Sequence, residues 1–409
     1  MAELRVAIAG AGLGGLCLAQ GLARAGLDVR VFERDDTLNA RRQGYRLHVD
    51  ARAGLALRDC LPPDLLGLFL ATCGRPSTQF TVLSSRLRVL HETRGDPNRD
   101  PDAVPTLSTS VNRQTLREIL AARLADRVHF GRELTGYREH DGVVELQFAD
   151  GQSASADVLV GADGVRSAVR EQYLPHAEVT DTGSRCIYGK TMLDDSVLPH
   201  LPPPLRLGFT AIIGDQVGMA AGAMQFRQRP PDAAAALAPD VWLSPAADYL
   251  MWAVSAQRDQ FPVSDAGLVA LDPGGLHEVA AAMIRKWHPE LRELVARADA
   301  DESFLIRVST SVPVPAWQPS RITLLGDAIH SMSPARGSGA NTALQDAALL
   351  AGLLSQAAAD QASIPAAIGQ YEQQMRGYGF AAVRASREAE QLNAARSGGL
   401  LVRLASRLP

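Results

Sequence analysis

A glycine loop lies between a strand pattern and a helix pattern at the N-terminal end of this 409-residue chain. The apolar run at residues 4–9 predicts a buried parallel strand, and residues 13–25 predict an apolar helix. Between them, Gly10, Gly12 and Gly15 form a Gly-x-Gly-x-x-Gly sequence. A strand, a glycine turn and a helix in this order predict the opening of a βαβ unit in a parallel sheet. No other feature of the sequence constrains the fold as strongly.

The three glycines each have a physical reason in such a unit. Gly10 makes the tight turn, Gly12 lets the backbone approach a pyrophosphate, and Gly15 allows the helix to pack closely on the strand. The helix N-terminus adds free N–H groups and a partial positive charge. Residues 28–33 predict the next parallel strand, and Glu33 at its end has the spacing of a ribose-binding acid. The unit therefore predicts a dinucleotide site, without separating NAD from FAD.

A second glycine-rich turn follows another predicted strand. Residues 157–161 predict a buried strand that leads into the segment Gly161–Ser167, where Ser167 suits a helix N-cap. Taken alone, this segment is explained by a strand-to-helix turn that an Asp163–Arg166 pair stabilises.

A third such turn lies near the C-terminal end. Residues 321–325 predict a buried strand, and the loop Gly326–Asn341 leads from it into a helix. Asp327 at the strand end suits the hydroxyl groups of a polyol, and the loop offers backbone N–H groups to an anion, such as the N1–C2=O region of a reduced flavin. A histidine such as His330 in this loop is more often structural than a base.

The middle of the chain has a different character, with short strand patterns and proline-rich breaks. We expect the nucleotide domain to be split between residues 1–179 and 318–409, the second part carrying C-terminal helices, with a mostly β substrate domain inserted at 180–317. The strands expected in the insert are 185–192, 206–213, 217–226 and 249–256, and the helices expected after it are 338–357 and 364–392. Before the insert, helices are expected near 51–59 and at 112–124, and Asp141-Gly142 is a hairpin signal between strands at 133–139 and 143–149.

Composition and charge exclude several classes of protein. The net charge of -4 gives no basic footprint for nucleic acid and no polybasic patch for a membrane. The four cysteines are not spaced as metal ligands, so neither a metal site nor a disulfide framework is expected. Glycines interrupt the apolar run at residues 6–25, which argues against a signal peptide. We expect a cytoplasmic protein whose partners are small molecules, with no protein partner implied.

In this order and spacing, the three motifs resemble those of the class A flavoprotein monooxygenases, the para-hydroxybenzoate hydroxylase-like family, from Val6 to about residue 390. The resemblance implies an α/β protein with a Rossmann-like FAD-binding domain, an inserted mostly β substrate domain and C-terminal helices. It also implies a reaction in which NADPH or NADH reduces FAD. The reduced flavin and O2 then form a C4a-hydroperoxide, and its distal oxygen passes to the substrate. Because the cofactor carries the difficult chemistry, no metal or catalytic triad is expected.

The resemblance also assigns cofactor contacts to numbered positions. Asp163, together with Arg166, would handle both FAD and NAD(P)H, and Asp327 would bind the ribityl chain. The residues implied to line the isoalloxazine ring are Pro334, Gly337, Gly339 and Asn341. The residues of the N-terminal part that are implied to contact FAD are Gly10, Gly12, Gly15, Glu33, Arg34, Arg42, Gly44, Arg113 and Leu134.

Two features depart from the family pattern. Arg336 places a large cation in the loop near the flavin, where it points to solvent or shapes the pocket. Gly377 and Gly379 stand where the family often has an Arg-Pro step, which leaves the packing of the last helix open.

The substrate is expected under the sheet of the inserted domain, near the flavin loop. The candidate strands carry little charge and no arginine cluster, which favours a larger, mostly apolar substrate such as a polycyclic aromatic, polyketide-like or indole-like molecule. Of the two polar residues that follow Gly44, Arg46 ranks above His48 as a pocket residue. The candidates at alternating strand positions, for each of which core packing is the commoner role, are Tyr188, Phe209, Met219 and Trp252.

Other functions remain open on the same fold. One is an FAD-dependent cyclase or reductase, and another is a flavin-binding protein that sequesters a ligand with little turnover. A flavin halogenase is disfavoured because the Gly-Trp-x-Trp-x-Ile-Pro signature is absent from the sequence.

Overall fold

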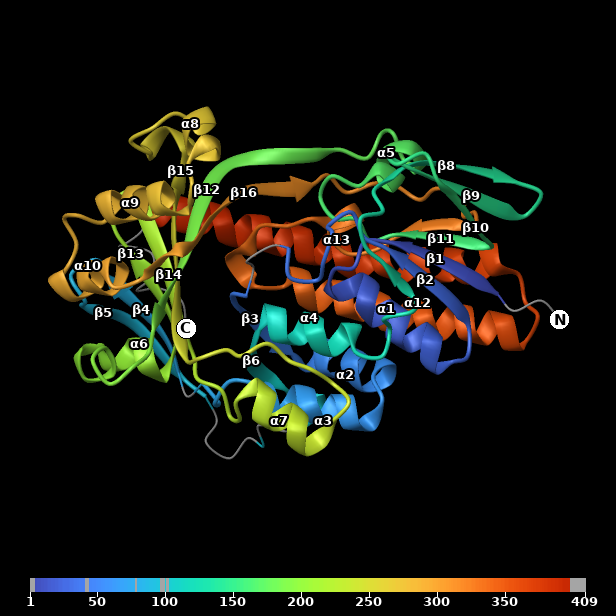
Figure 1. The fold of residues 1–409 in the computed structure, drawn as a ribbon. Coiled ribbons are helices and arrows are strands. Elements are labelled where there is room, and N and C mark those ends of the chain that lie inside the picture. Colours follow the sequence, from blue (N-terminus) through green and yellow to red (C-terminus); the bar gives the residue numbers. More distant parts are fainter. Residues whose placement is uncertain (1–3, 41–43, 78, 96–99, 101–102, 398–409) are drawn as a thin grey trace.

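The computed structural model describes residues 4–40, 44–77, 79–95, 100 and 103–397, with side chains described up to residue 392 (Figure 1). Two large sheets lie side by side along the length of the molecule, a parallel one at the right of Figure 1 and a mostly antiparallel one at the left.

The parallel sheet has five strands in the order β17-β11-β1-β2-β7. Every neighbouring pair in it is parallel, and the glycine-loop strand β1 pairs with β2 on one side and β11 on the other. Its strands are nearly all apolar and buried, as expected for a sheet that is covered on both faces. The strands are β1 (Arg5–Ala9), β2 (Asp28–Phe32), β7 (Val128–His129), β11 (Val158–Gly161) and β17 (Ile322–Leu324).

Long helices cover this sheet. Helix α1 (Leu13–Arg24) packs on α12 (Gly339–Ala359), and α12 also contacts α2 (Ala51–Cys60) and α13 (Ile364–Ser397). The predicted helices at 13–25, 51–59, 338–357 and 364–392 correspond to these four. None of the helices in the described ranges is both long enough and apolar enough to cross a membrane.

The predicted hairpin at Asp141-Gly142 forms as expected. Asp141 and Gly142 have φ values of 48° and 76°, the left-handed pair that a two-residue hairpin turn requires. The turn joins β8 (Leu134–His140) to β9 (Val143–Phe148), and β10 (Ser153–Ala156) completes a three-stranded sheet.

The second large sheet has seven strands in the order β16-β12-β15-β14-β13-β4-β5. All neighbours are antiparallel except β13 and β4. Two of its strands come from residues 79–94, ahead of the segment predicted as the insert, whose boundaries stay a prediction. The strands are β4 (Gln79–Ser84), β5 (Val89–Arg94), β12 (Val179–Met192), β13 (Gly208–Ile213), β14 (Val217–Met224), β15 (Tyr249–Gln257) and β16 (Asp299–Ser311).

The two faces of the seven-stranded sheet have different coverings because side chains alternate along each strand. The outer face packs against helices that the strand-based prediction of the insert did not include (Figure 1). These helices are α6 (Pro203–Leu207), α8 (Asp265–Ala270), α9 (Pro273–Met283) and α10 (Pro289–Ala296). The other face, called the inner face below, meets Tyr45 and Arg46 at the start of β3 (Arg46–Asp50).

Strand β3 pairs with β6 (Ser108–Asn112) and connects the two large sheets. Each strand ends at a helix cap: Asp50 accepts from the N–H groups of Arg52 and Ala53 to start α2, and Asn112 caps α4 (Arg113–Ala121) through the N–H of Thr115. The sequence predicted a helix at 112–124, in agreement with α4, but gave no sign of α3 (Pro63–Thr72). That helix carries apolar residues around much of its circumference, so the amphipathic period is weak.

Helix α13 places a carboxylic acid behind the parallel sheet. Glu372 Oε1 accepts from the hydroxyl of Thr323 in β17 at 2.9 Å, while Oε2 is buried without a partner among the described residues. Burial raises the pKa of Glu372 from 4.5 to about 7, more than the hydrogen bond to Thr323 and the charge of Arg376 lower it.

Replacing Glu372 with glutamine is expected to stabilise the protein at pH 8. The raised pKa means that the folded state holds this proton more tightly than the unfolded chain does, so stability is lost as pH rises from 4.5 to about 7. Glu372→Gln removes this loss, by up to about 2–3 kcal/mol at pH 8 and by little at pH 4.5. Denaturant unfolding at both pH values measures the difference.

The exposed Glu388 on the same helix provides the matched control, Glu388→Gln, which is expected to change stability little at either pH. If Glu372→Gln lowers the free energy of unfolding equally at pH 4.5 and pH 8, the contribution of this position to stability comes from packing rather than from ionisation.

Candidate functional site

The three glycine-rich loops come together because their strands are neighbours in one parallel sheet. Strands β1, β11 and β17 all end at the same edge, and the loop that follows each strand lies there. The loops touch through backbone hydrogen bonds: the N–H of Ala162 donates to Ala9 O at 2.8 Å, and the N–H of Leu325 donates to Gly161 O at 2.9 Å. Motifs that are about 150 residues apart in the sequence thus form one site.

The glycines of the first loop divide into two kinds. Gly10 has a φ of +107°, and a Cβ there would collide with the backbone of Ala162. A Cβ on Gly15 would collide with the carbonyl oxygen of Gly10. A Cβ on Gly12 would meet no atom within 4 Å, so the backbone is open at this position, at the N-terminus of α1. This arrangement fits a pyrophosphate that lies against Gly12 and the first N–H groups of the helix.

Glu33 at the end of β2 holds the glycine loop. Its Oε2 accepts from the N–H of Ala11 at 2.8 Å, and its Oε1 accepts from the N–H of Asp35 at 3.0 Å. The carboxylate is buried beside the loop, and its contact with a ribose stays a prediction.

Arg117 is a buried residue of this site that the sequence interpretation missed. Its Nε donates to Ala11 O at 2.8 Å, its Nη1 donates to Leu38 O at 2.6 Å, and its Nη2 lies 3.6 Å from Glu33 Oε2. It lies one helical turn after Arg113 in α4, and that spacing on an amphipathic helix was the available signal.

The second motif is arranged differently from the simple ion pair considered for it. Arg166 is exposed, and no ion pair joins it to Asp163 in the described part of the chain. Asp163 Oδ2 accepts from the N–H of Val169 at 3.4 Å, whereas Oδ1 is buried and has no partner among the described residues. Burial raises the pKa of Asp163. A buried, unsatisfied carboxylate oxygen beside the glycine loop fits a contact to a bound cofactor.

Arg170 joins the second motif to the third. Its Nη1 donates to Val165 O at 2.8 Å and to Ala328 O at 3.1 Å. Ala328 belongs to the short helix α11 (Asp327–His330), so this buried arginine, also missed from the sequence, holds two motif loops together.

Asp327 lies in a recess at the end of β17. The residue is exposed on one side, while protein atoms surround the carboxylate on its other sides. This burial raises the pKa of Asp327 more than the charges of His330 and Arg113 lower it. A carboxylate held in a recess fits the hydroxyl groups of a polyol chain such as ribityl.

His330 is fully buried behind this recess. It shares a hydrogen bond of 2.6 Å between its Nε2 and Asp346 Oδ2, and Asp346 also accepts from the N–H of Gly326 and from the hydroxyl of Tyr378. Burial lowers the pKa of His330, but the charge and hydrogen bond of Asp346, with the charge of Asp327, raise it overall. A histidine without exposed surface supports the loop rather than acting as a base on substrate.

Asn341 has a scaffold role that corrects the prediction for its side chain. The side chain is 1% exposed, donates to His48 O and Gly337 O, and accepts from the N–H of Asp50. It therefore pairs with the edge of β3 and fixes the flavin-loop helix α12 to that strand. Only its backbone remains to line a flavin ring.

Tyr45 connects the recess of Asp327 to the inner face of the seven-stranded sheet. The guanidinium of Arg113 lies 5.8 Å from the centre of its ring, and the charge of Asp327 raises its pKa, after the larger effect of burial. The rings of Tyr45, Tyr188 and Phe304 form a cluster with centroid distances of 5.1–5.5 Å. The aromatic surface of the inner face thus begins beside the predicted flavin site.

The structure separates the four substrate candidates onto two faces. Tyr188 and Phe209 belong to the inner face. Met219 and Trp252 are buried in the outer core, where the Trp252 Nε1 donates to the hydroxyl of Thr191 at 3.2 Å. The first pair cannot line the same pocket as the second, because successive residues of a strand point to opposite faces of the sheet. The strand register decides which face each residue takes. Met219 and Trp252 are core residues.

The remaining predicted residues occupy several environments. Arg46 is buried on the inner face, whereas the side chain of His48 is exposed. Arg42 lies outside the described residues. Leu134 begins β8 and is buried, Gly44 lies near Gln114 and Lys190, and Gly339 begins α12. Of the remaining predicted residues, Arg34, Pro334 and Gly337 are exposed. Arg336, the loop cation that departs from the family pattern, is exposed as well.

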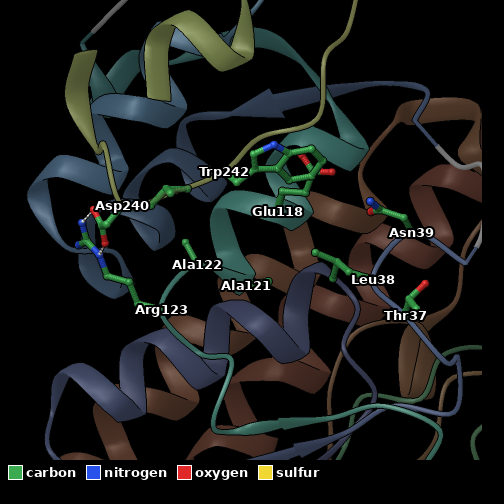
Figure 2. Close-up of a pocket in the computed structure, with 10 residues that line it drawn as sticks. Thr37, Leu38, Asn39, Glu118, Ala121, Ala122, Arg123, Asp240 and Trp242 are labelled. Carbon is green, nitrogen blue, oxygen red and sulfur yellow. Dashed lines mark hydrogen bonds and ion pairs between the residues drawn. The ribbon is translucent and has the colours of Figure 1, made fainter. Parts of the chain in front are cut away.

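A surface recess of about 560 Å³ lies between α4 and the segments 37–39 and 240–242 (Figure 2). The ring of Trp242 lies over Glu118, and an ion pair joins Arg123 to Asp240 at its rim. Ser244 donates to Glu118 through both its N–H and its hydroxyl. None of the predicted site residues lines this recess.

Alanine at the two kinds of glycine is expected to have different effects. Gly15→Ala places a methyl group against Gly10 O and should destabilise the fold by about 3 kcal/mol or more. Gly12→Ala meets no protein atom, so unfolding should be unchanged, while FAD affinity falls about 10- to 100-fold because the methyl group projects where the pyrophosphate is expected. Thermal unfolding of the FAD-free protein and FAD titration by flavin fluorescence measure the two effects. Equal FAD affinity for Gly12→Ala and the wild type would contradict this placement.

Comparisons with known proteins agree with this geometry. A model described as "FAD binding domain" matches residues 278–386, and one described as "NAD(P)-binding Rossmann-like domain" matches residues 8–55. The solved structure of a putative FAD-containing monooxygenase from Photorhabdus luminescens superposes with a TM-score of 0.80 at 28% identity, over 98% of this chain and all of that one.

Curated relatives include the dual O-methyltransferase/FAD-dependent monooxygenase CTB3 of Cercospora beticola, 34% identical over 85% of this chain. The match covers 42% of that protein, so the chain spans about two fifths of the length of the relative. The aurachin C monooxygenase/isomerase of Stigmatella aurantiaca is 26% identical over 90% of this chain and 84% of its own length.

These findings confirm the α/β fold class with its Rossmann-like part, and FAD with NAD(P)H as the cofactors of the family. The roles of single residues toward FAD stay predictions. The matched models, the relatives and the superposed structure support a class A FAD-dependent monooxygenase family, the para-hydroxybenzoate hydroxylase-like family, for this chain.

Proposed function

We propose that this protein is an NAD(P)H-dependent FAD monooxygenase that hydroxylates or otherwise oxygenates an aromatic, polycyclic or polyketide-like small molecule. The observation that carries the proposal is the junction at Tyr45. There the recess of Asp327, where the flavin chain is expected, adjoins an aromatic surface on the inner face of the second sheet. A cofactor site next to a large apolar surface suits oxygen transfer to an aromatic ring.

The residues of this chain would divide the work of holding the cofactor. Gly12 and the N-terminus of α1 would bind the pyrophosphate, Glu33 the ribose, and Asp327 the ribityl hydroxyls. Bound FAD would supply the redox chemistry, namely oxidation of NAD(P)H and activation of O2. The buried pairs made by Arg117 and Arg170 would keep the three loops in register.

The inner face would hold the substrate and exclude water. Besides the ring cluster at Tyr45, Phe209, Ala220 and Ile306 are partly exposed on it, and Met224 and Met251 are buried beside them. Methionine and aromatic side chains provide a polarisable surface that accepts large planar molecules. The names of relatives support this substrate class: one is a 3-amino-4-hydroxybenzoate 2-monooxygenase of Streptomyces cremeus and another is the aurachin C monooxygenase/isomerase.

The purified protein is expected to be yellow and to oxidise NADPH faster when an aromatic substrate is present. A screen of polycyclic aromatic and polyketide-like compounds under ¹⁸O2 tests this, with mass spectrometry of the product. Incorporation of one ¹⁸O atom per turnover supports the monooxygenase. A colourless protein that takes up no FAD would overturn the proposal.

The two alternatives have different outcomes in the same screen. A cyclase or reductase changes the substrate without incorporating ¹⁸O. A ligand-sequestering protein binds FAD that NAD(P)H does not reduce, with or without a ligand.

A further inference from the structure

Four arginine side chains are buried in the described part of the chain, and three of them donate to at least two acceptors each. Arg117 and Arg170 each donate to two backbone carbonyl groups, as described above. Arg185 donates to the carboxylates of Asp181 and Asp265, two bonds to each. Buried charges are normally paired in this way because an unpaired charge is costly to remove from water.

Arg46 is the exception among these four. It is 8% exposed, and among the described residues its only hydrogen-bond acceptor is Ala223 O, 3.2 Å from its Nε. No carboxylate of the described chain lies within ion-pair distance of it, and the one hydrogen bond that it donates to a described residue comes from Nε, not from the terminal nitrogens. Burial accordingly lowers the pKa of Arg46 to about 10, although the guanidinium stays charged at neutral pH.

The inner face is shaped to receive this side chain. A Cβ at Gly222 would lie 3.2–3.3 Å from Cδ, Nε and Cζ of Arg46, so a side chain there would push the guanidinium a few tenths of an ångström away from strand β14. Phe209, which pairs with Gly222 across the sheet, places its ring centre 5.7 Å from Arg46 Cζ. Glycine and an aromatic ring thus surround a cation on a mostly apolar face.

The other cation on this face has its charge balanced. Lys190 lies 5.3 Å from the centre of the Tyr249 ring, and its Nζ is 2.6 Å from Glu302 Oε2. Among the described residues, Arg46 is therefore the buried cation of the inner face that has no carboxylate partner. Its fork geometry suits a carboxylate, or the oxygen of an ionised phenol or enol.

We propose that the guanidinium of Arg46 binds an acidic oxygen of a large aromatic substrate, whose rings lie on the inner face of the seven-stranded sheet. The inference rests on the proposed function and narrows its substrate class from aromatic molecules to aromatic acids, acidic phenols and enols. A single arginine, rather than a cluster, agrees with a substrate that is mostly apolar and carries one anionic group.

A matched pair of probes tests the proposal. Anthracene-2-carboxylate and anthracene-2-carboxamide have nearly the same shape and differ in charge. Equilibrium dialysis against the FAD-loaded protein, followed by anthracene fluorescence, measures binding without any turnover. The wild type is expected to bind the acid about 10- to 100-fold more tightly than the amide, as for a hydrogen-bonded charge pair. Arg46→Gln should bind both probes equally, and Arg46→Lys should keep part of the preference.

Lys190→Gln is the matched control, because it removes a cation of the same face that is already paired. It should retain the preference for the acid. FAD affinity and thermal unfolding of each variant are measured alongside. If Arg46→Gln does not fold, Arg46→Lys and the comparison of the two probes on the wild type decide the question.

Several outcomes would overturn the proposal: a wild type that binds neither probe or does not prefer the acid, a preference that survives in Arg46→Gln, or a preference that Lys190→Gln removes. A fall in FAD affinity as large as the fall in acid affinity would assign Arg46 to the cofactor instead. Acid binding through Arg46 without ¹⁸O incorporation from any substrate would count against the monooxygenase and leave this inference standing. Oxygenation of neutral aromatics by a protein that shows no preference for the acid would support the monooxygenase and overturn this inference.

Discussion

The site depends on the contact between the ends of two adjacent parallel strands, β1 and β11. Gly10 after β1 and Ala162 after β11 approach so closely that no side chain fits at Gly10. This contact places the first two motif loops together, and β17 on the other side of β11 adds the third. The buried side chains of Glu33, Arg117 and Arg170 then connect the loops through backbone groups. A change in strand order would scatter all of these residues.

The parallel sheet and the motif loops were predictable because their signals are local. A buried apolar strand, a glycine turn and a helix cap each lie within a few residues, and the left-handed φ values of Asp141 and Gly142 follow from a two-residue signature. The face on which a strand residue lies is not local information. Met219 and Phe209 both fit an alternating pattern, and only the pairing of strands and the helices that cover the sheet place them on opposite faces.

The same limit explains the residues that were missed or reassigned. Arg117 and Arg170 bind carbonyl groups about 100 and 158 residues away in sequence, which no spacing rule anticipates. The side chain of Asn341 satisfies the exposed edge of β3, a strand about 290 residues earlier. In each case a polar side chain satisfies a backbone group that the fold leaves unpaired at a loop or sheet edge, so its role depends on the assembled structure.

Strands β12 and β16 belong to the seven-stranded sheet at one end and lie beside the motif loops at the other, where the N–H of Ser311 donates to Ser331 O (Figure 1). They pair from Val179 with Ser311 to Lys190 with Asp299, a continuous ribbon about 40 Å long with two irregularities. Such a ribbon restrains the seven-stranded sheet relative to the motif loops, because bending the two regions apart there would break hydrogen bonds between β12 and β16. On the opposite side, β3 meets the seven-stranded sheet through side chains such as Arg46 rather than through a strand ladder.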